Sequence, residues 1–208
     1  MDKTDSLEWR GAAVDVRDAA RCYGFFARIL LEPIPVPGDG FGRQTAEQAE
    51  QLASALGEGP VDALVRELHS DHPDDLQQAL AVDRTALFRG VDPQGLLPPY
   101  EAFWTGKESS LQSVMAAYRQ AGMEPASSNG ERSDYLGMEL AFLEALAAAE
   151  AAADSEQSLL LRNMRGIFID EHLSPWVPRY CETAAPQAKT GFFRSFLGLV
   201  PRILDLNP

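Results

Sequence analysis

Apolar residues recur at helical spacing along most of the chain and are densest between residues 134 and 153. Downstream of Asp134 this segment is apolar over most of the circumference of a helix. Its two neighbouring stripes are Leu136, Leu140, Leu143 and Ala147, and Tyr135, Met138, Phe142 and Leu146. A helix with so broad an apolar face belongs in the middle of a helical packing. The pattern therefore predicts the central helix of the fold here.

Acidic residues gather where this central helix begins. Glu131 and Asp134 precede it, and Glu139 lies one turn below Tyr135. Carboxylates near the positive end of a helix dipole are favourable by ~0.3–1 kcal/mol. One interpretation is therefore capping, with Asp134 as N-cap or with Ser128 and Glu131 as a capping box. The other interpretation is a polar site at the start of a buried helix.

Similar periodicity predicts helices on both sides of the central one. The expected ranges are 6–31, 43–56, 60–69, 74–88 and 107–121, then a helix ending near Asp170, a short one after it, and 187–205. Ser174 followed by Pro175 has the pattern of an N-cap with proline at the first helical position, which would start the short helix. Residues 89–99 are expected to form a loop that delivers Tyr100 to Trp104. No segment alternates as a strand does, so we expect one all-α domain over residues 1–208, a bundle of eight or nine helices.

Composition narrows the class of protein. The chain has 208 residues, 45% of them hydrophobic, and a net charge of −13. Such acidity argues against binding to nucleic acid or to anionic membranes and favours either solubility or a basic partner. The first residues lack the apolar core of a secretory signal, and no apolar run approaches the ~20 residues of a membrane span. We therefore expect a cytoplasmic protein that does not insert into membranes.

The sequence gives little support for a metal site, a disulfide bond or a nucleotide-binding site. Cys22 and Cys181 lie far apart without paired spacing, so we expect two buried reduced thiols. His69 and His72 stand among acids, but Pro73 interrupts the helix at this point, and no metal site is predicted. The glycine patterns that hold nucleotide phosphates are missing from the sequence. No cofactor is expected.

A histidine near the C-terminal end of the chain is expected to be structural. His172 lies in the run FIDEHLSPWVPRYCE, where one predicted helix ends and the next begins. We expect His172 to bond the last carbonyls of the preceding helix while Leu173, Trp176 and Tyr180 pack inward.

Three sequence segments resemble motifs of one known family. The run Leu87 to Gly90 followed by Pro98 to Glu101 is similar to its LF-x-G…PYES segment, with Ala102 in place of serine. The run Glu131 to Leu136 is similar to its E-P-x-D-H-[IL] motif, with Arg132 in place of proline and Tyr135 in place of histidine. The third segment is Phe168…His172-Leu173…Trp176, similar to F-x-x-x-H-L-x-x-W. Together, over about residues 20–180, they resemble the TorD/DmsD-type redox-enzyme maturation chaperones, which include NarJ-like members.

The resemblance implies a cytoplasmic chaperone and not an enzyme. Such proteins bind the precursor of a molybdenum-cofactor oxidoreductase, often through its twin-arginine signal peptide, and hold it until the cofactor is inserted. The resemblance also implies a monomer or a dimer that exchanges helices. Two alternatives stay open. One is a nucleotide-binding or nucleotide-hydrolysing helical enzyme, since guanine-nucleotide binding has been proposed within the family. The other is a structural subunit retained in the mature oxidoreductase.

A twin-arginine peptide needs carboxylates beside an apolar groove. Residues 92–139 contain seven acids and three bases. Arginine pairs with carboxylates through two parallel bonds and stacks on aromatic rings for ~0.5–2 kcal/mol. The expected client-peptide site consists of Tyr100, Glu101, Trp104, Glu131, Asp134, Tyr135 and Glu139. In the alternative interpretation, Tyr100, Phe103 and Trp104 fill the core beneath their loop.

Overall fold

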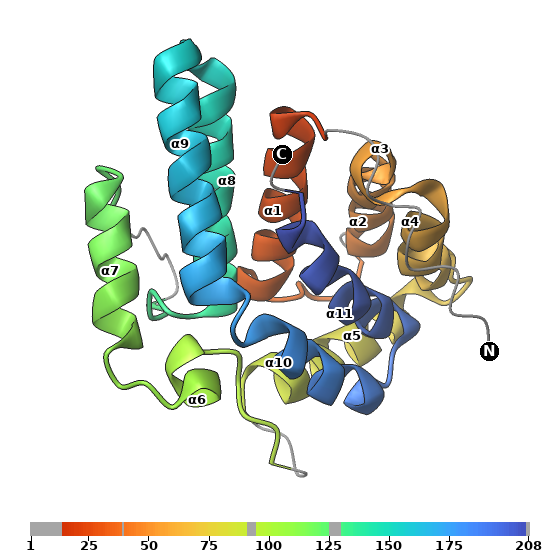
Figure 1. The fold of residues 1–208 in the computed structure, drawn as a ribbon. Coiled ribbons are helices and arrows are strands. Elements are labelled where there is room, and N and C mark those ends of the chain that lie inside the picture. Colours follow the sequence, from red (N-terminus) through yellow and green to blue (C-terminus); the bar gives the residue numbers. More distant parts are fainter. Residues whose placement is uncertain (1–13, 39, 91–94, 125–129, 207–208) are drawn as a thin grey trace, which may run out of the picture.

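The computed structural model describes residues 14–38, 40–90, 95–124 and 130–206. In these ranges the chain forms eleven α-helices and no strand (Figure 1), which confirms the all-α prediction. Nine of the eleven have eight residues or more, and the other two are short turns. The first helix, expected from residue 6, begins at Val16, because the Asp15 side chain caps it there by accepting a hydrogen bond from the N–H of Arg17. Residues 6–13 and other parts of the single domain expected over residues 1–208 lie outside the described residues.

The helices before the central one partly follow the predicted ranges. They are α1 (Val16–Leu31), α2 (Phe41–Glu50), α3 (Ala53–Leu56), α4 (Glu58–Val65), α5 (Pro73–Phe88), α6 (Glu101–Thr105) and α7 (Ser110–Gln120), with a 3₁₀ turn at Arg66–His69. The helix predicted over 43–56 is divided in two, because residues 51 and 52 form a turn. The short helix α6 was not predicted, since the sequence around it reads as a loop.

The remaining helices are α8 (Leu136–Ala152), α9 (Ser155–Phe168), α10 (Val177–Ala184) and α11 (Gly191–Leu204). A π turn at Ile169–Leu173 continues α9, and a 3₁₀ turn at Ala185–Gln187 follows α10. The prediction that Ser174 caps the next helix is wrong. The Ser174 N–H donates to the carbonyl of Ile169 at 2.8 Å, within the π turn, and α10 begins three residues later at Val177.

The central helix predicted from the two apolar stripes is α8. It packs against α1 on one side and α9 on the other (Figure 1). All eight stripe residues are buried, and they belong to one connected apolar core. Because α8 contributes core contacts around most of its circumference, it has little amphipathic character of its own.

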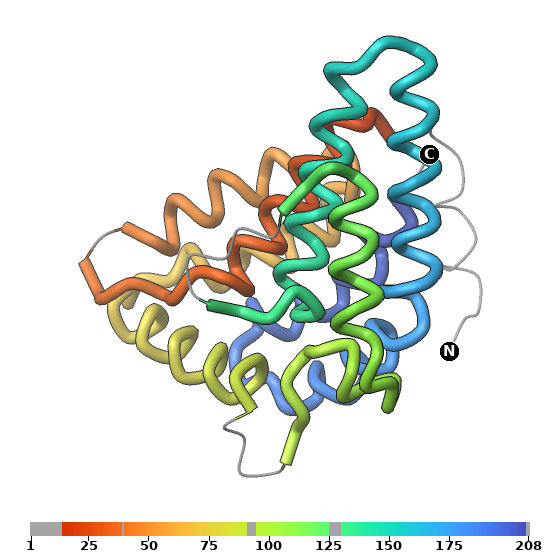
Figure 2. Tube along the Cα trace, turned by 90° about the vertical axis from the view of Figure 1, so that its left-hand side faces the viewer, coloured from red at the N-terminus to blue at the C-terminus, as the bar shows by residue number. Residues whose placement is uncertain are grey.

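Aromatic rings connect α5 and α11 to this core. Phe196 of α11 packs against Phe26 of α1, with ring centroids 4.7 Å apart, and against Phe88 of α5 at 6.0 Å. The view in Figure 2 shows α6, α7 and the segment that leads into α8 together on one face of the molecule. Two of the family-like segments therefore meet on this face.

Candidate functional site

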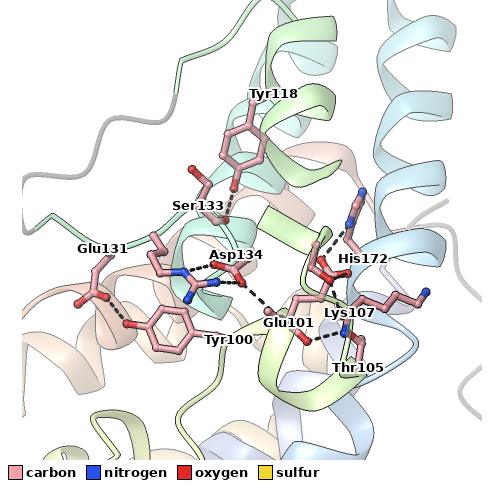
Figure 3. A network of polar contacts seen from close by, with 12 residues as sticks. Tyr100, Glu101, Thr105, Lys107, Tyr118, Glu131, Ser133, Asp134 and His172 are labelled. Atoms are coloured by element: carbon pink, nitrogen blue, oxygen red, sulfur yellow. Dashed lines mark hydrogen bonds and ion pairs between the residues drawn. The ribbon is translucent and has the colours of Figure 1, made fainter. Parts of the chain in front are cut away.

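An antiparallel bridge between Tyr100 and Tyr135 joins the segment before α6 to the segment before α8. The N–H of Glu101 donates to the carbonyl of Asp134 at 2.9 Å. The two tyrosine rings lie 5.2 Å apart, centroid to centroid. Figure 3 shows the polar contacts around this bridge, among them those between Glu131 and Tyr100 and between Glu101 and His172.

The carboxylate of Asp134 is fully buried and receives two parallel hydrogen bonds from one arginine. Nε of Arg132 donates to Oδ1 at 2.9 Å, and Nη2 donates to Oδ2 at 2.8 Å. The backbone N–H of Ala102, in the first turn of α6, also donates to Oδ2, at 3.4 Å. The prediction that Asp134 caps α8 is therefore wrong: Tyr135 holds the N-cap position and its side chain makes no cap bond. The bridge to Glu101 holds Asp134 beside α6. The Asp134 carboxylate therefore accepts a hydrogen bond from the first turn of α6 and none from α8.

Glu131 lies next to Asp134 at the outer edge of this face, with its side chain 7% exposed. It forms an ion pair with Arg89 and accepts a hydrogen bond of 2.8 Å from the hydroxyl of Tyr100. Burial raises the pKa of Tyr100, and the nearby Arg89 and Arg132 partly offset the rise, so the hydroxyl keeps the proton that it donates. Ser128, the other member of the expected capping box, lies outside the described residues.

Aromatic rings flank both arginines. The guanidinium carbon of Arg132 lies 5.3 Å from the ring centroid of Tyr100 and 5.7 Å from that of Phe103. The corresponding distance from Arg89 to Tyr135 is 5.9 Å. Contacts of this kind contribute ~0.5–1 kcal/mol at exposed sites. We call the six residues Arg89, Tyr100, Phe103, Glu131, Arg132 and Asp134 the arginine–carboxylate cluster.

The side chains of Trp104 and Phe103, both on α6, point in opposite directions. Trp104 is 9% exposed and packs into the core, and its Nε1 donates to the carbonyl of Pro98 at 3.2 Å. Phe103 is 46% exposed. The interpretation in which these rings fill the core therefore holds for Trp104, whereas Phe103 faces solvent beside Tyr100.

Behind the bridge, Glu101 connects three elements. Its Oε1 accepts a hydrogen bond of 2.9 Å from the hydroxyl of Ser110, and its Oε2 lies 3.0 Å from Nδ1 of His172. His172 was expected to bond the last carbonyls of α9, and this expectation is wrong. The π turn directs the ring toward α6, while the His172 carbonyl accepts a bond of 2.5 Å from Nε1 of Trp176. Leu173 and Trp176 are fully buried.

Glu139 is the innermost acid of the predicted site and is fully buried. Among the described residues, neither of its carboxyl oxygens has a partner at ordinary hydrogen-bond geometry. Burial raises the pKa of Glu139 well above its ordinary value, and the neighbouring Glu101 and Asp134 carboxylates raise it further. Burial therefore favours the neutral, protonated form of Glu139. A neutral acid avoids placing a third negative charge beside Glu101 and Asp134.

The residues expected to bind the client differ sharply in exposure. Glu101 is 3% exposed, and Asp134, Tyr135 and Glu139 are fully buried. By contrast, the side chain of Arg132 is 42% exposed. A bound molecule reaches the buried acids only by replacing a side chain that covers them. Sequence reasoning counted Arg132 as one base among several and missed its pairing with Asp134, although the two stand only two positions apart.

Other candidate chemistry finds no site in the described part of the chain. No cluster of three or more His, Cys, Asp or Glu side chains there could hold a metal ion. The thiols of Cys22 and Cys181 are buried and unpaired with each other, and burial raises the pKa of Cys22 to about 12. None of the described helices combines the length and the apolar character that a membrane span requires.

Comparison with known proteins places this chain in a family. Residues 39–182, more than half of the chain, match the family model described as nitrate reductase delta subunit. The chain belongs to this family. The matched range contains α2 to α9 and the whole arginine–carboxylate cluster.

Individual relatives agree. The chain is similar to a protein named chaperone protein TorD from Aliivibrio fischeri, 27% identical over 183 residues, which is 78% of this chain and 85% of that protein. It is also similar to chaperone protein TorD from Photobacterium profundum, 23% identical over 140 residues and 64% of each chain. The resemblance to the TorD-like, NarJ-related family, which rested on three short motifs, is thereby confirmed.

Proposed function

We propose that this protein is a cytoplasmic chaperone in the maturation of a molybdenum-cofactor oxidoreductase. It binds the precursor of that enzyme, through its twin-arginine signal peptide, until the cofactor has been inserted. Support comes from membership of the family and from two relatives that are both named chaperone protein TorD. In this proposal the protein has no catalytic role and no cofactor of its own.

One observation carries the binding part of the proposal. Asp134 holds a guanidinium through two parallel bonds, and the Tyr100 ring lies 5.3 Å from that guanidinium. A planar fork of donors above a carboxylate and beside a ring is the arrangement that selects arginine over lysine. The same chemistry suits the paired arginines of a signal peptide.

We place the client-peptide site at Tyr100, Glu101, Trp104, Glu131, Asp134, Tyr135 and Glu139. Within it, Glu131 and Asp134 accept the client arginines and Tyr100 stacks on one of them. The four remaining residues are nearly or fully buried and keep the carboxylates in position.

In this proposal, the apolar part of the signal peptide binds to a neighbouring surface formed by α7 and α9. A small pocket of about 80 Å³ between α7 and α9 is lined mainly by apolar residues, among them Ala117, Phe142, Met164 and Ile167, together with Gln120, Glu171 and His172. On α9, Leu160 is 59% exposed and Ile167 is 56% exposed. Because His172 lines this pocket and also contacts Glu101, the pocket adjoins the inner side of the client-peptide site.

A calorimetric titration tests the proposal. The protein is titrated with the twin-arginine peptide of the oxidoreductase precursor encoded beside it, and with the same peptide carrying two lysines in place of the arginines. We expect saturable binding of the arginine peptide and at least ~10-fold weaker binding of the lysine peptide, because lysine loses the two-bond geometry. Equal affinity for the two peptides would rule out the proposed site.

A second candidate function follows from the description of the family, which names a subunit of nitrate reductase. In that case the protein stays bound to the mature oxidoreductase as a structural subunit. Purification of the active, cofactor-loaded enzyme separates the two functions. A chaperone is missing from the active enzyme, whereas a subunit is present at a fixed ratio. Light scattering of the purified protein distinguishes a monomer from a helix-exchanged dimer.

A further inference from the structure

Both carboxylates proposed to receive client arginines already hold arginines of this chain. Asp134 is paired with Arg132, and Glu131 is paired with Arg89. Each of the two guanidinium groups also lies within 6 Å of an aromatic ring, Tyr100 for Arg132 and Tyr135 for Arg89. The chain therefore fills its own arginine positions with an internal pair.

The two internal arginines are accessible to exchange with another guanidinium. Their side chains are 42% exposed for Arg132 and 30% exposed for Arg89, so water reaches both. A different pair in the same protein provides the contrast, since Arg165 and Glu150 are bonded at 2.8 Å and both side chains are 1% exposed or less. The Arg165 pair is sealed in the core, whereas the Arg132 pair has a buried carboxylate under a solvent-accessible cation.

Exchange of one arginine for another conserves the interactions of the buried carboxylate. An incoming guanidinium makes the same two bonds to Asp134, and the displaced Arg132 side chain becomes hydrated. Departure of Arg132 without a replacement leaves the Asp134 carboxylate buried beside Glu101 and Glu139 with no cation, which is strongly unfavourable. The main states of the site therefore have a guanidinium over Asp134, from the chain or from the client, and the open site is a minor state.

We propose that Arg132, with Arg89, is an internal competitor that occupies the arginine-binding positions until the two arginines of a client peptide displace it. The inference rests on the proposed function and adds a mechanism of selectivity to it. A competitor lowers the apparent affinity by the fraction of time for which the site is open. A peptide with one arginine, or with lysines, replaces the internal pair poorly and is rejected.

Two variants of Arg132 test the competition. Arg132→Ala removes the competitor, and Arg132→Lys weakens it while keeping its charge. Arg119→Ala is the matched control, because Arg119 is exposed on α7 and its loss makes the same change in net charge. If the site is open about one tenth of the time in the unaltered protein, Arg132→Ala binds a labelled peptide with two adjacent arginines about tenfold more tightly. Arg132→Lys shifts the affinity in the same direction, and Arg119→Ala stays within about twofold.

A second measurement uses methylguanidinium alone as the probe, at concentrations below those that denature proteins. The melting temperature of Arg132→Ala is expected to be below that of the unaltered protein and to rise with methylguanidinium, since the probe restores the cation over Asp134. Methylammonium at equal concentration is expected to give no such rise. Methylguanidinium is expected to leave Arg119→Ala unchanged or to lower its melting temperature slightly.

The outcomes separate the two proposals. Peptide binding by the unaltered protein with equal or weaker binding by both Arg132 variants overturns the competition and leaves the proposed function standing. Rescue by methylguanidinium without any peptide binding supports an exchangeable guanidinium site and contradicts signal-peptide binding. Absence of both rescue and tighter binding overturns the inference.

Discussion

The hydroxyl of Tyr135 donates a hydrogen bond of 3.1 Å to the backbone carbonyl of Leu30, in the last turn of α1. Both residues are fully buried, and Nη2 of Arg84 donates to the same carbonyl at 2.5 Å. Burial raises the pKa of Tyr135 to about 12, so the hydroxyl retains its proton. The N-cap residue of α8 thereby fastens the candidate site to the end of α1.

Removal of this hydroxyl is expected to have a small effect on stability. Tyr135→Phe loses one hydrogen bond but leaves Arg84 on the Leu30 carbonyl, so the free energy of unfolding should fall by ~0.5–1.5 kcal/mol. The Phe ring still stacks, and affinity for a twin-arginine peptide should not change. Urea denaturation and peptide titration of the same preparation measure both. Lost binding at intact stability would mean that the hydroxyl contacts the client.

Trp176 is expected to act only through the fold. It is fully buried, and its indole N–H donates to the carbonyl of His172. Trp176→Ala should lower the free energy of unfolding by ~3–5 kcal/mol, the range for large core truncations. Trp176→Phe, the matched variant, keeps most of the buried ring and should lose much less. A Trp176→Ala protein as stable as the unaltered one but unable to bind the peptide would show that this residue has a direct role.

Glu139 gives the protein a specific dependence of stability on pH. Its pKa in the folded protein is raised by burial, so above the ordinary glutamate pKa of about 4.3 the folded state binds a proton that the unfolded state has lost. The contribution of this group to stability therefore falls as pH rises from that value toward the raised pKa. Glu139→Gln stays neutral at every pH and removes this loss.

The measurement is thermal unfolding of Glu139→Gln and of the unaltered protein between pH 4 and pH 8. The variant is expected to be the more stable of the two at pH 8, and the difference should vanish near pH 4. Glu156→Gln, an exposed position in the first turn of α9, is the control and should show no such trend. A difference that stays constant over this pH range would mean that Glu139 is ionised in the folded protein.

The sequence predicted the parts of the fold that depend on long periodic patterns. The stripes of α8 extend over about three turns, and a pattern of that length determines which side of the helix faces the core. Local patterns were less informative. Ser174 and Pro175 have the composition of a helix start, but the π turn that ends at Leu173 already uses the Ser174 N–H. Tertiary context thus overrode a correct local preference.

The candidate site was predicted in composition and not in geometry. The sequence indicated that acids and rings from two segments converge, and the Tyr100–Tyr135 bridge brings them together. It did not indicate that the five-residue helix α6 turns Trp104 inward and Phe103 outward, because so short a helix has no periodic signal. The pairing of Arg132 with Asp134 depends on the same bridge.

The most direct test of the account is a calorimetric titration of Asp134→Asn with the twin-arginine peptide. Asparagine keeps the shape of the side chain and removes its charge. Arg132, which is 42% exposed, can turn to water, so we expect only a modest loss of stability. Asp75→Asn, at an exposed position in the first turn of α5, is the matched control for net charge.

Loss of one charge-assisted contact should weaken peptide binding by ~1.5–3 kcal/mol, about ten- to a hundredfold, while Asp75→Asn should bind like the unaltered protein. Binding by the unaltered protein should also weaken with added salt, although less than for fully exposed pairs. Equal affinity of Asp134→Asn and the unaltered protein for the peptide would contradict the account, because Asp134 would then hold α6 and Arg132 in place without receiving a client arginine.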